Sequence, residues 1–299
     1  MIAVERIGCG IDFSDHSRYA LQHAAALARW YSARLFGVHV SEAPLPPADG
    51  PRRLPGLGPL RPEARHDLMR TLEGFLSPAA AAAAVQPVLL EGHPARELAR
   101  WAEELPADLL VLGTHGRHGF ERLMLGSVTE RIVRRAACPV LTVPLPSRGL
   151  PVEGRPPFRT ILCPVDFSPP SLAALVFAVS LAEESDAGLI LLHVVEWSEE
   201  WAREAGAPAP EGEAPAERRA RDQLAGLVTE EARTFARPEI VVARGKASGE
   251  ILRVASEREA EVIVIGVQGR GALDLAVFGS TTNHVVRAAG CPVLTIRAA

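Results

Sequence analysis

The sequence predicts an α/β protein made of two tandem, doubly wound domains, each with a five-stranded, mostly parallel sheet. Two observations carry this prediction. The chain matches itself at a nearly constant offset, and within each half short apolar runs alternate with segments of helical periodicity. At 299 residues and 47% hydrophobic composition, the chain is long enough for two domains that each bury a core.

The repeat begins at residues 12–14, Asp-Phe-Ser, which recur at 166–168, an offset of 154 (166 less 12). From Gly92, which matches Gly245, the offset is 153, so one residue has been lost before this point. A repeat of this length indicates a duplicated domain, because a solenoid has a shorter period repeated more often. Prolines between 144 and 157 cannot continue a strand ladder. We therefore predict one domain over residues 1–151 and a second over 152–299.

Each copy begins with a strand and a helix. In the second copy, Ser168 is the expected helix cap and Pro169 lies in the first turn. The spacing i, i+3, i+4, i+7 predicts one buried helix face, formed by Leu172, Leu175, Val176 and Val179 in the second copy and by Leu21, Ala24, Ala25 and Ala28 in the first.

The remaining strands are predicted from continuous apolar runs, which suit strands buried on both faces. In the first copy one strand ends at Val40 and others span 85–90, 109–112 and 140–143; in the second they span 160–165, 189–194, 240–242, 262–265 and 293–296. The segments 44–62 and 197–216 are rich in proline, glycine, alanine and charge. They are expected to be surface excursions, either plain loops or lids.

A glycine pattern, GxxG-x9-GS, follows the fourth strand of each copy. It runs from Gly113 to Ser127 and again from Gly266 to Ser280. Glycines allow positive φ and close approach, so backbone N–H groups can converge on phosphate oxygens. The N-terminus of the next helix adds its dipole, and each serine is expected to cap that helix and to donate its hydroxyl to phosphate. Glycines that serve only a tight turn remain the alternative.

The composition of the chain argues against several classes of function and site. A net charge of −4 gives no basic field for nucleic acid, and no apolar run is long enough for a membrane span. The start of the chain lacks the pattern of a signal peptide, so a cytoplasmic protein is expected. Four cysteines without a CxxC pair suit neither a disulfide scaffold nor zinc. Lys246 is the only lysine, and no GxxxxGK[ST] loop is present.

Both copies resemble the universal stress protein family over nearly the whole chain. The resemblance rests on the Asp-Phe-Ser after strand one, a His-Val pair that closes strand two, the GxxG-x9-GS loop and Cys-Pro-Val before the last strand. It implies strand order 3-2-1-4-5 and binding of ATP, ADP or AMP, with Mg²⁺ as a companion ion. It also implies an intramolecular pseudo-dimer of the two domains, with homodimerisation open. The switch point of this order, between strands one and four, is where open α/β sheets bind ligands.

Carried over by position, the family's binding role falls on the residues after strands one, two and four. They are, in the first copy, Gly10, Asp12, Val40, Gly113, Thr114, His115, Gly116, Arg117, His118, Gly119, Gly126, Ser127 and Val128, and in the second Pro164, Asp166, Val194, Gly266, Val267, Gln268, Gly269, Arg270, Gly271, Ala272, Gly279, Ser280 and Thr281. Both aspartates would face the nucleoside, and both valines would meet adenine through the backbone. The copies differ at Gln268 and at 271–272, so their affinities for phosphate are expected to differ.

Structural roles compete with some of these assignments. Asp12 and Asp166 are equally expected to cap the following turn. His39 and His193 are expected to be hydrogen-bonded structural histidines, and Cys9 and Cys163 to be small buried side chains. Cys138 and Cys291 are expected to begin the turn before a proline. Three function classes remain: an adenine-nucleotide-binding regulatory module of the stress response, a slow ATPase or nucleotide transferase, and a nucleotide-free scaffold. Without catalytic carboxylates and a lysine beside the loop, at most weak ATP hydrolysis is expected and no catalytic or metal-binding residue is assigned.

Overall fold

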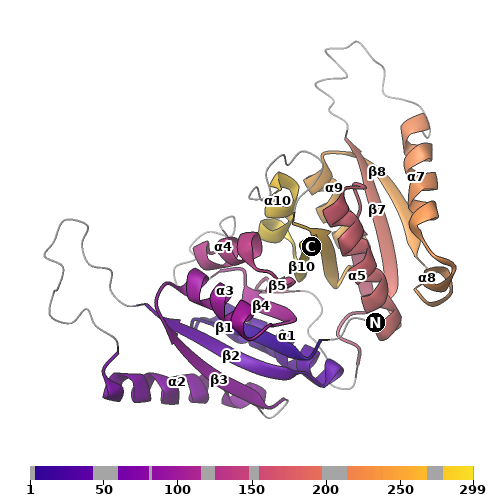
Figure 1. Cartoon of the computed structure of the whole chain (residues 1–299). Coiled ribbons are helices and arrows are strands. Elements are labelled where there is room, and N and C mark those ends of the chain that lie inside the picture. Colours follow the sequence, from indigo (N-terminus) through magenta and orange to yellow (C-terminus); the bar gives the residue numbers. More distant parts are fainter. Residues whose placement is uncertain are drawn as a thin grey trace, which may run out of the picture. The chain divides into compact units, whose positions relative to one another are not determined.

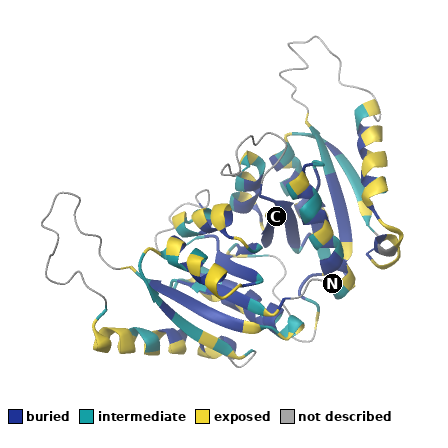
Figure 2. Cartoon of the chain, in the orientation of Figure 1, coloured by how far each residue is buried: buried dark blue, intermediate teal, exposed yellow. Residues whose placement is uncertain are grey.

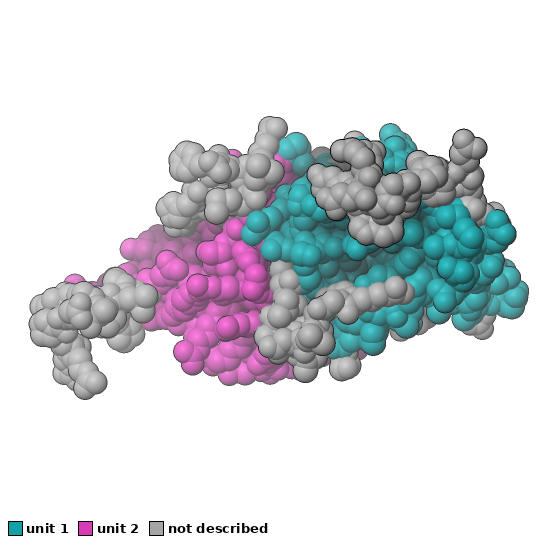
Figure 3. Space-filling view, turned by 90° about the horizontal axis from the view of Figure 1, so that it is seen from above, with its two compact units in different colours: residues 1–2, 121–123, 146–299 teal, residues 3–120, 124–145 magenta. Residues whose placement is uncertain are grey.

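The computed structural model describes residues 4–42, 60–80, 83–115, 125–147, 155–196, 214–236, 238–267 and 279–298. Among these, the chain divides into two compact units, one ending at Leu145 and the other beginning at Pro146 (Figure 3). The predicted domain boundary after residue 151 lies outside the described residues and stays a prediction.

The N-terminal unit alternates strands and helices. Its elements are β1 (Arg6–Ile11), α1 (Asp15–Tyr31), β2 (Arg34–Ser41), α2 (Pro62–Ala80), β3 (Val85–Glu91), α3 (Pro94–Glu104), β4 (Leu109–Gly113), α4 (Ser127–Arg135) and β5 (Val140–Val143) (Figure 1). The strands pair in the order β3-β2-β1-β4-β5, and each pairing is parallel. This is the order that the family resemblance implies.

The C-terminal unit repeats this architecture. Its elements are β6 (Thr160–Pro164), α5 (Pro169–Ser185), β7 (Gly188–Glu196), α7 (Pro215–Leu227), α8 (Glu230–Phe235), β8 (Glu239–Gly245), α9 (Ala247–Glu257), β9 (Val262–Gly266), α10 (Ser280–Ala288) and β10 (Val293–Ile296). The order β8-β7-β6-β9-β10, again parallel, corresponds strand by strand to the first unit.

Each sheet is the middle of three layers. In the first unit α1 and α2 contact each other over one face, while α3 and α4 contact each other over the opposite one. All five residues of β4 and all five of β9 are buried (Figure 2). Continuous apolar runs are needed here because both faces of a central parallel strand are covered by helices. The predicted α/β class and most strand bounds are therefore confirmed.

The first helix of each unit shows one correct and one wrong prediction. Leu21, Ala24, Ala25 and Ala28 of α1 are all buried, as expected. In α5 the predicted face is largely wrong, because Val176 is 71% exposed and only Leu175 of the predicted residues is buried. The buried residues of the helix are mostly small, namely Ser171, Ala174, Leu175, Ala178, Ser180, Leu181, Ala182 and Ser185. Alanine at the contact lets the helix approach the sheet closely, so apolar periodicity alone gave the wrong rotation.

Helices α2 and α7 begin where the sequence predicts the ends of surface excursions. Pro62 opens α2 and Pro215 opens α7, consistent with the tolerance of proline in a first helical turn. The predicted excursions therefore end earlier than residues 62 and 216. Their central parts, residues 43–59 and 197–213, lie outside the described residues, so the choice between loop and lid stays open.

Candidate functional site

The turn after the first strand of each unit is built by the repeated Asp-Phe-Ser sequence. Oδ1 of Asp12 accepts a hydrogen bond from the backbone N–H of Ser14 at 3.0 Å, and Asp166 does the same with Ser168. Both serines in turn cap α1 and α5, as predicted for Ser168. The turn-capping role of the two aspartates is thus present in both copies, and Asp166 additionally lines the cavity described below.

The residue between aspartate and serine carries backbone strain that the sequence did not reveal. Phe13 has φ of 65° and Phe167 has φ of 63°, a region that phenylalanine rarely adopts. Each ring packs on a histidine of the neighbouring strand, with centroids 4.5 Å apart for Phe13 and His39 and 4.8 Å for Phe167 and His193. Packing of this kind offsets the cost of the strained backbone.

The two histidines fasten this turn to the second strand. Nδ1 of His39 lies 2.8 Å from the carbonyl oxygen of Ile11, and Nδ1 of His193 lies 2.7 Å from that of Val165. The predicted structural hydrogen bonds are therefore present. In each domain, the Asp-Phe-Ser turn and the histidine thus form one packed cluster. This cluster fixes the C-terminal end of the first strand beside the second strand.

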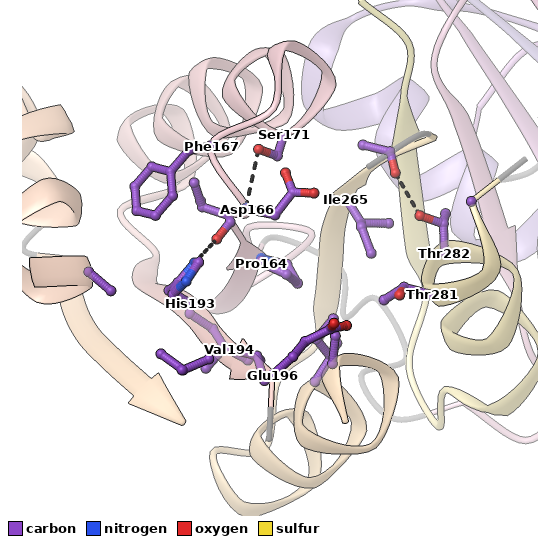
Figure 4. A pocket seen from close by; sticks show the side chains of 18 of the residues that line it. Pro164, Asp166, Phe167, Ser171, His193, Val194, Glu196, Ile265, Thr281 and Thr282 are labelled. Carbon is purple, nitrogen blue, oxygen red and sulfur yellow. Dashed lines mark hydrogen bonds between the residues drawn. The ribbon is translucent and has the colours of Figure 1, made fainter. Parts of the chain in front are cut away.

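In the second unit these residues border a cavity of about 840 Å³ at the C-terminal ends of the strands (Figure 4). Its walls come from β6 and the turn after it, from the end of β7, from α7 and α9, and from the start of α10. The cavity lies at the switch point between β6 and β9, which pair directly. Seven residues assigned from the sequence line it: Pro164, Asp166, Val194, Gly266, Gly279, Ser280 and Thr281.

The N-terminus of α10 opens into this cavity, since Gly279 to Thr282 all line it. The first N–H groups of a helix have no partner within the helix, and its dipole favours an anion there. Gly279, and not Ser280, occupies the cap position, and the same holds for Gly126 and Ser127 in α4. The prediction that these serines cap their helices is wrong: each is the first helical residue.

The glycine loop is closed at its base in both units. The N–H of Gly126 donates to the carbonyl of Thr114 at 2.8 Å, and the N–H of Gly279 donates to that of Val267 at 3.1 Å. One turn into the helix, the hydroxyl of Thr129 donates to the Gly113 carbonyl at 2.8 Å. The Thr282 hydroxyl makes the equivalent bond at 2.7 Å. These hydrogen bonds join the end of β4 to the start of α4, and the end of β9 to the start of α10.

Gly113 and Gly266 are needed for close approach and not for unusual backbone angles. A Cβ added at Gly113 would lie 3.0 Å from the backbone of His16, and one at Gly266 would lie 2.7 Å from that of Pro170. Among the described glycines, only Gly92 and Gly245 have positive φ. The expectation of positive φ in the loop therefore fails at Gly113, Gly126, Gly266 and Gly279.

Other predicted residues have these positions. Val40 is buried at the end of β2, and Gly10 faces Leu112, whose side chain a Cβ at Gly10 would overlap. Thr114 is buried and His115 is half-buried next to it. Ser127 and Val128 open α4, and Val267 directly follows β9. The calls at Gly116, Arg117, His118 and Gly119, and at Gln268, Gly269, Arg270, Gly271 and Ala272, lie outside the described residues.

Sequence reasoning missed the wall that α7 and α9 contribute. Arg219 and Gln223 of α7 and Ala247 and Ile251 of α9 line the cavity, as does Glu196 at the end of β7. Lys246, exposed at the cap position of α9, directly precedes Ala247. No sequence signal pointed to α7 because its start was hidden in a segment predicted as an excursion.

Three of the cysteines are not activated nucleophiles. Burial raises the pKa of the Cys138 thiol to about 11, and it raises the pKa of Cys9 and Cys163 further. None of the four cysteines forms a disulfide bond. Across the described ranges, no cluster of three or more His, Cys, Asp or Glu side chains is arranged to hold a metal ion. No helix in the same ranges has the length and apolar character that a membrane crossing requires.

The sequence of the chain is similar to those of known proteins. A model of the universal stress protein family matches residues 3–144 and again residues 157–297. The universal stress protein MJ0531 of Methanocaldococcus jannaschii is 34% identical over 140 residues, which cover 46% of this chain and 80% of that protein.

Two further similarities extend over more of the chain. The universal stress protein Mb2028c of Mycobacterium bovis is 32% identical over 194 residues, covering 64% of this chain but only 62% of that protein. A crystal structure of a universal stress protein from Archaeoglobus fulgidus matches 99% of this chain and 97% of its own, with a TM-score of 0.64 and 19% identity. At that identity the likeness concerns the fold.

Proposed function

The chain belongs to the universal stress protein family, with two family domains in tandem, and from this premise we propose that it binds adenine nucleotide as a regulatory module of the stress response. One observation carries the proposal: a cavity at the switch point of the second sheet receives the N-terminus of α10. Its volume of about 840 Å³ suits a ligand of nucleotide size.

The residues around the cavity fit the parts of a nucleotide. Ser280 and Thr281 would hold phosphate through their backbone N–H groups and hydroxyls. Asp166 would accept a hydrogen bond from ribose through the part of its carboxylate that reaches the cavity. Val194 and Ile251 offer apolar surface to a base. Arg219, on α7, adds a cation to the cavity wall.

The first domain would hold a second nucleotide in the same way. It shares the turn at Asp12, the histidine at the end of β2 and the closed base of the glycine loop. Magnesium would enter with the phosphates, because this ion is usually held by substrate phosphates and few protein ligands.

Calorimetry with ATP, ADP and AMP tests the proposal. The full chain is expected to bind up to two nucleotides. Gly126→Leu should remove the first site and Gly279→Leu the second, since a bulky side chain at the cap position blocks the approach of an anion to the helix N-terminus. Gly74→Leu is the control, because a Cβ at this exposed position of α2 meets nothing within 4 Å.

The same experiment separates the competing classes. No nucleotide bound by the chain and none released on denaturing it would leave the scaffold as the better description. Steady phosphate release that Gly279→Leu abolishes would instead indicate a slow ATPase.

A further inference from the structure

A pair of imidazoles distinguishes the first candidate site from the second. His16 lies in the first turn of α1, and His115 lies two residues after the end of β4. Their ring centroids are 5.2 Å apart. At the repeat offsets of 154 and 153, the second domain has Pro170 and Gln268 at these positions.

The correspondence of His16 and Pro170 is geometric as well as sequential. A Cβ built on Gly113 meets the backbone of His16, and a Cβ built on Gly266 meets the backbone of Pro170. The first helical turn therefore lies against the end of the fourth strand in the same manner in both domains. The side chain that this turn presents beside the loop differs, being histidine in the first domain and proline in the second.

His115 is held in one orientation by its neighbour. Its Nδ1 lies 3.0 Å from Oγ1 of Thr114, a residue that is itself buried. Its Nε2 is buried and has no hydrogen-bond partner among the described residues. The carbonyl of Thr114 also accepts the N–H of Gly126, so the backbone that leads into His115 is bonded to the cap position of α4. An anion bound at the start of α4 would therefore lie close to this part of the chain.

The charge state of His16 depends on its burial and on three neighbouring groups, His115, Asp12 and Asp15. Burial lowers the pKa of His16, and His115 lowers it further, because two imidazolium charges at this spacing repel. Asp12, on the turn after β1, and Asp15, on α1, act in the opposite direction. Since the net effect is a pKa below the ordinary value, His16 is mostly neutral at pH 7 in the free protein.

We infer that His16 and His115 couple occupation of the first site to proton uptake, so that phosphate binding there strengthens as pH falls while binding at the second site does not. The inference rests on the proposed nucleotide binding. A bound phosphate chain supplies negative charge, which favours the imidazolium form of each ring. The protons come from solvent, and each imidazolium N–H then donates to a phosphate oxygen.

The direction of the pH effect follows from this exchange. In the bound state the pKa of His16 would lie above its value in the free state. Binding would therefore take up protons between the two values, and affinity would rise as pH falls through that window. Below the free-state pKa of His16 this ring is already charged, so the affinity would level off.

The test uses the full-length chain with one site blocked at a time. Gly279→Leu leaves the first site and Gly126→Leu leaves the second. ATP affinity is measured calorimetrically at about pH 6, 7 and 8, a range that spans the ordinary histidine pKa. Repeating each titration in buffers of different ionisation enthalpy gives the number of protons taken up.

The first site is expected to gain up to about tenfold in affinity per pH unit for each proton taken up. The second site reports the contribution of ATP's own protonation, which both sites share. Adenosine, which has no phosphate, should bind the first site with no comparable pH dependence.

Variants that copy the second domain complete the test. His115→Gln alone should reduce the pH slope and proton uptake of the first site in part, and His16→Pro with His115→Gln should reduce them to those of the second. Proline is compatible with the fold because Pro170 occupies this helical position in α5.

Equal slopes at the two sites, or a slope that survives both substitutions, would overturn the inference and leave nucleotide binding intact. Absence of binding in the Gly279→Leu chain would overturn it as well, and absence in the Gly126→Leu chain too would remove the proposed function.

Discussion

At the ends of β4 and β9, a glycine lies directly under the first turn of a helix. Gly266 is the more tightly enclosed of the two, because the atoms nearest to an added Cβ are the backbone carbon and oxygen of Pro170 at 2.7 and 2.8 Å. Backbone cannot move aside as a flexible side chain can. The first glycine of each loop is thus required by the fold even before any ligand is considered.

This enclosure makes a prediction about stability. Gly266→Ala should destabilise the second domain by about 1–3 kcal/mol, the usual cost of overpacking, measured by urea unfolding without nucleotide. Gly249→Ala is the matched control, because this helical glycine has open space around it and alanine favours helix by about 0.5–1 kcal/mol. An unchanged midpoint for Gly266→Ala, together with loss of nucleotide binding, would show that the position serves only the ligand.

The sequence allowed several single residues to be placed correctly and left others out of reach. His39 and His193 could be predicted as hydrogen-bonded because a histidine at the end of a buried strand needs a partner. The positive φ of Phe13 and Phe167 could not, since phenylalanine gives no signal for that conformation. His16 was also missed, because its importance depends on a neighbour about a hundred positions away in the chain.

At the scale of elements, the two domains join the helix after β2 to the end of β3 by ion pairs of opposite polarity. In the first domain Arg65 of α2 pairs with Glu91 of β3, and in the second Glu217 of α7 pairs with Arg244 of β8. Glu91 and Arg244 are equivalent at the offset of 153. The contact has therefore been retained while the charges were exchanged.

The exposure of the side chains determines which of the two ion pairs contributes more to the free energy of unfolding. The side chains of Glu217 and Arg244 are 12% and 24% exposed, whereas Arg65 in the other pair is 47% exposed. Double-mutant cycles with glutamine should give a coupling free energy of about 1–2 kcal/mol in the second domain and at most about 0.5 kcal/mol in the first. Equal couplings would mean that burial at this contact does not matter. On the glutamate side of each cycle, glutamine keeps the side-chain volume and so isolates the charge.

Elements were predictable to different degrees for physical reasons. Strands such as β5 and β10 were bounded correctly because a run of apolar residues between turn residues has few alternatives. The buried face of α5 was not, because its contact surface is mostly alanine and serine while Val176 points to solvent. Helix α7 follows a proline-rich segment and contributes Arg219 and Gln223, so part of the candidate site was hidden with it.

At the scale of the whole molecule, each unit has five parallel strands of its own, its own helices on both faces and its own buried core. We therefore expect residues 1–151 and 152–299 to fold when each is produced alone. Circular dichroism and urea unfolding should show α/β secondary structure and a cooperative transition for each half. A half that stays unfolded would mean that the domains depend on each other and would argue against the predicted boundary.

Lys246 gives the chain a useful asymmetry. As the only lysine, it is the single side-chain amine in 299 residues, and it directly precedes a residue that lines the cavity of the second domain. An amine-reactive fluorophore would therefore attach at one internal position, exposed at the start of α9. Such a probe would report on the occupancy of the second site in the unmutated protein.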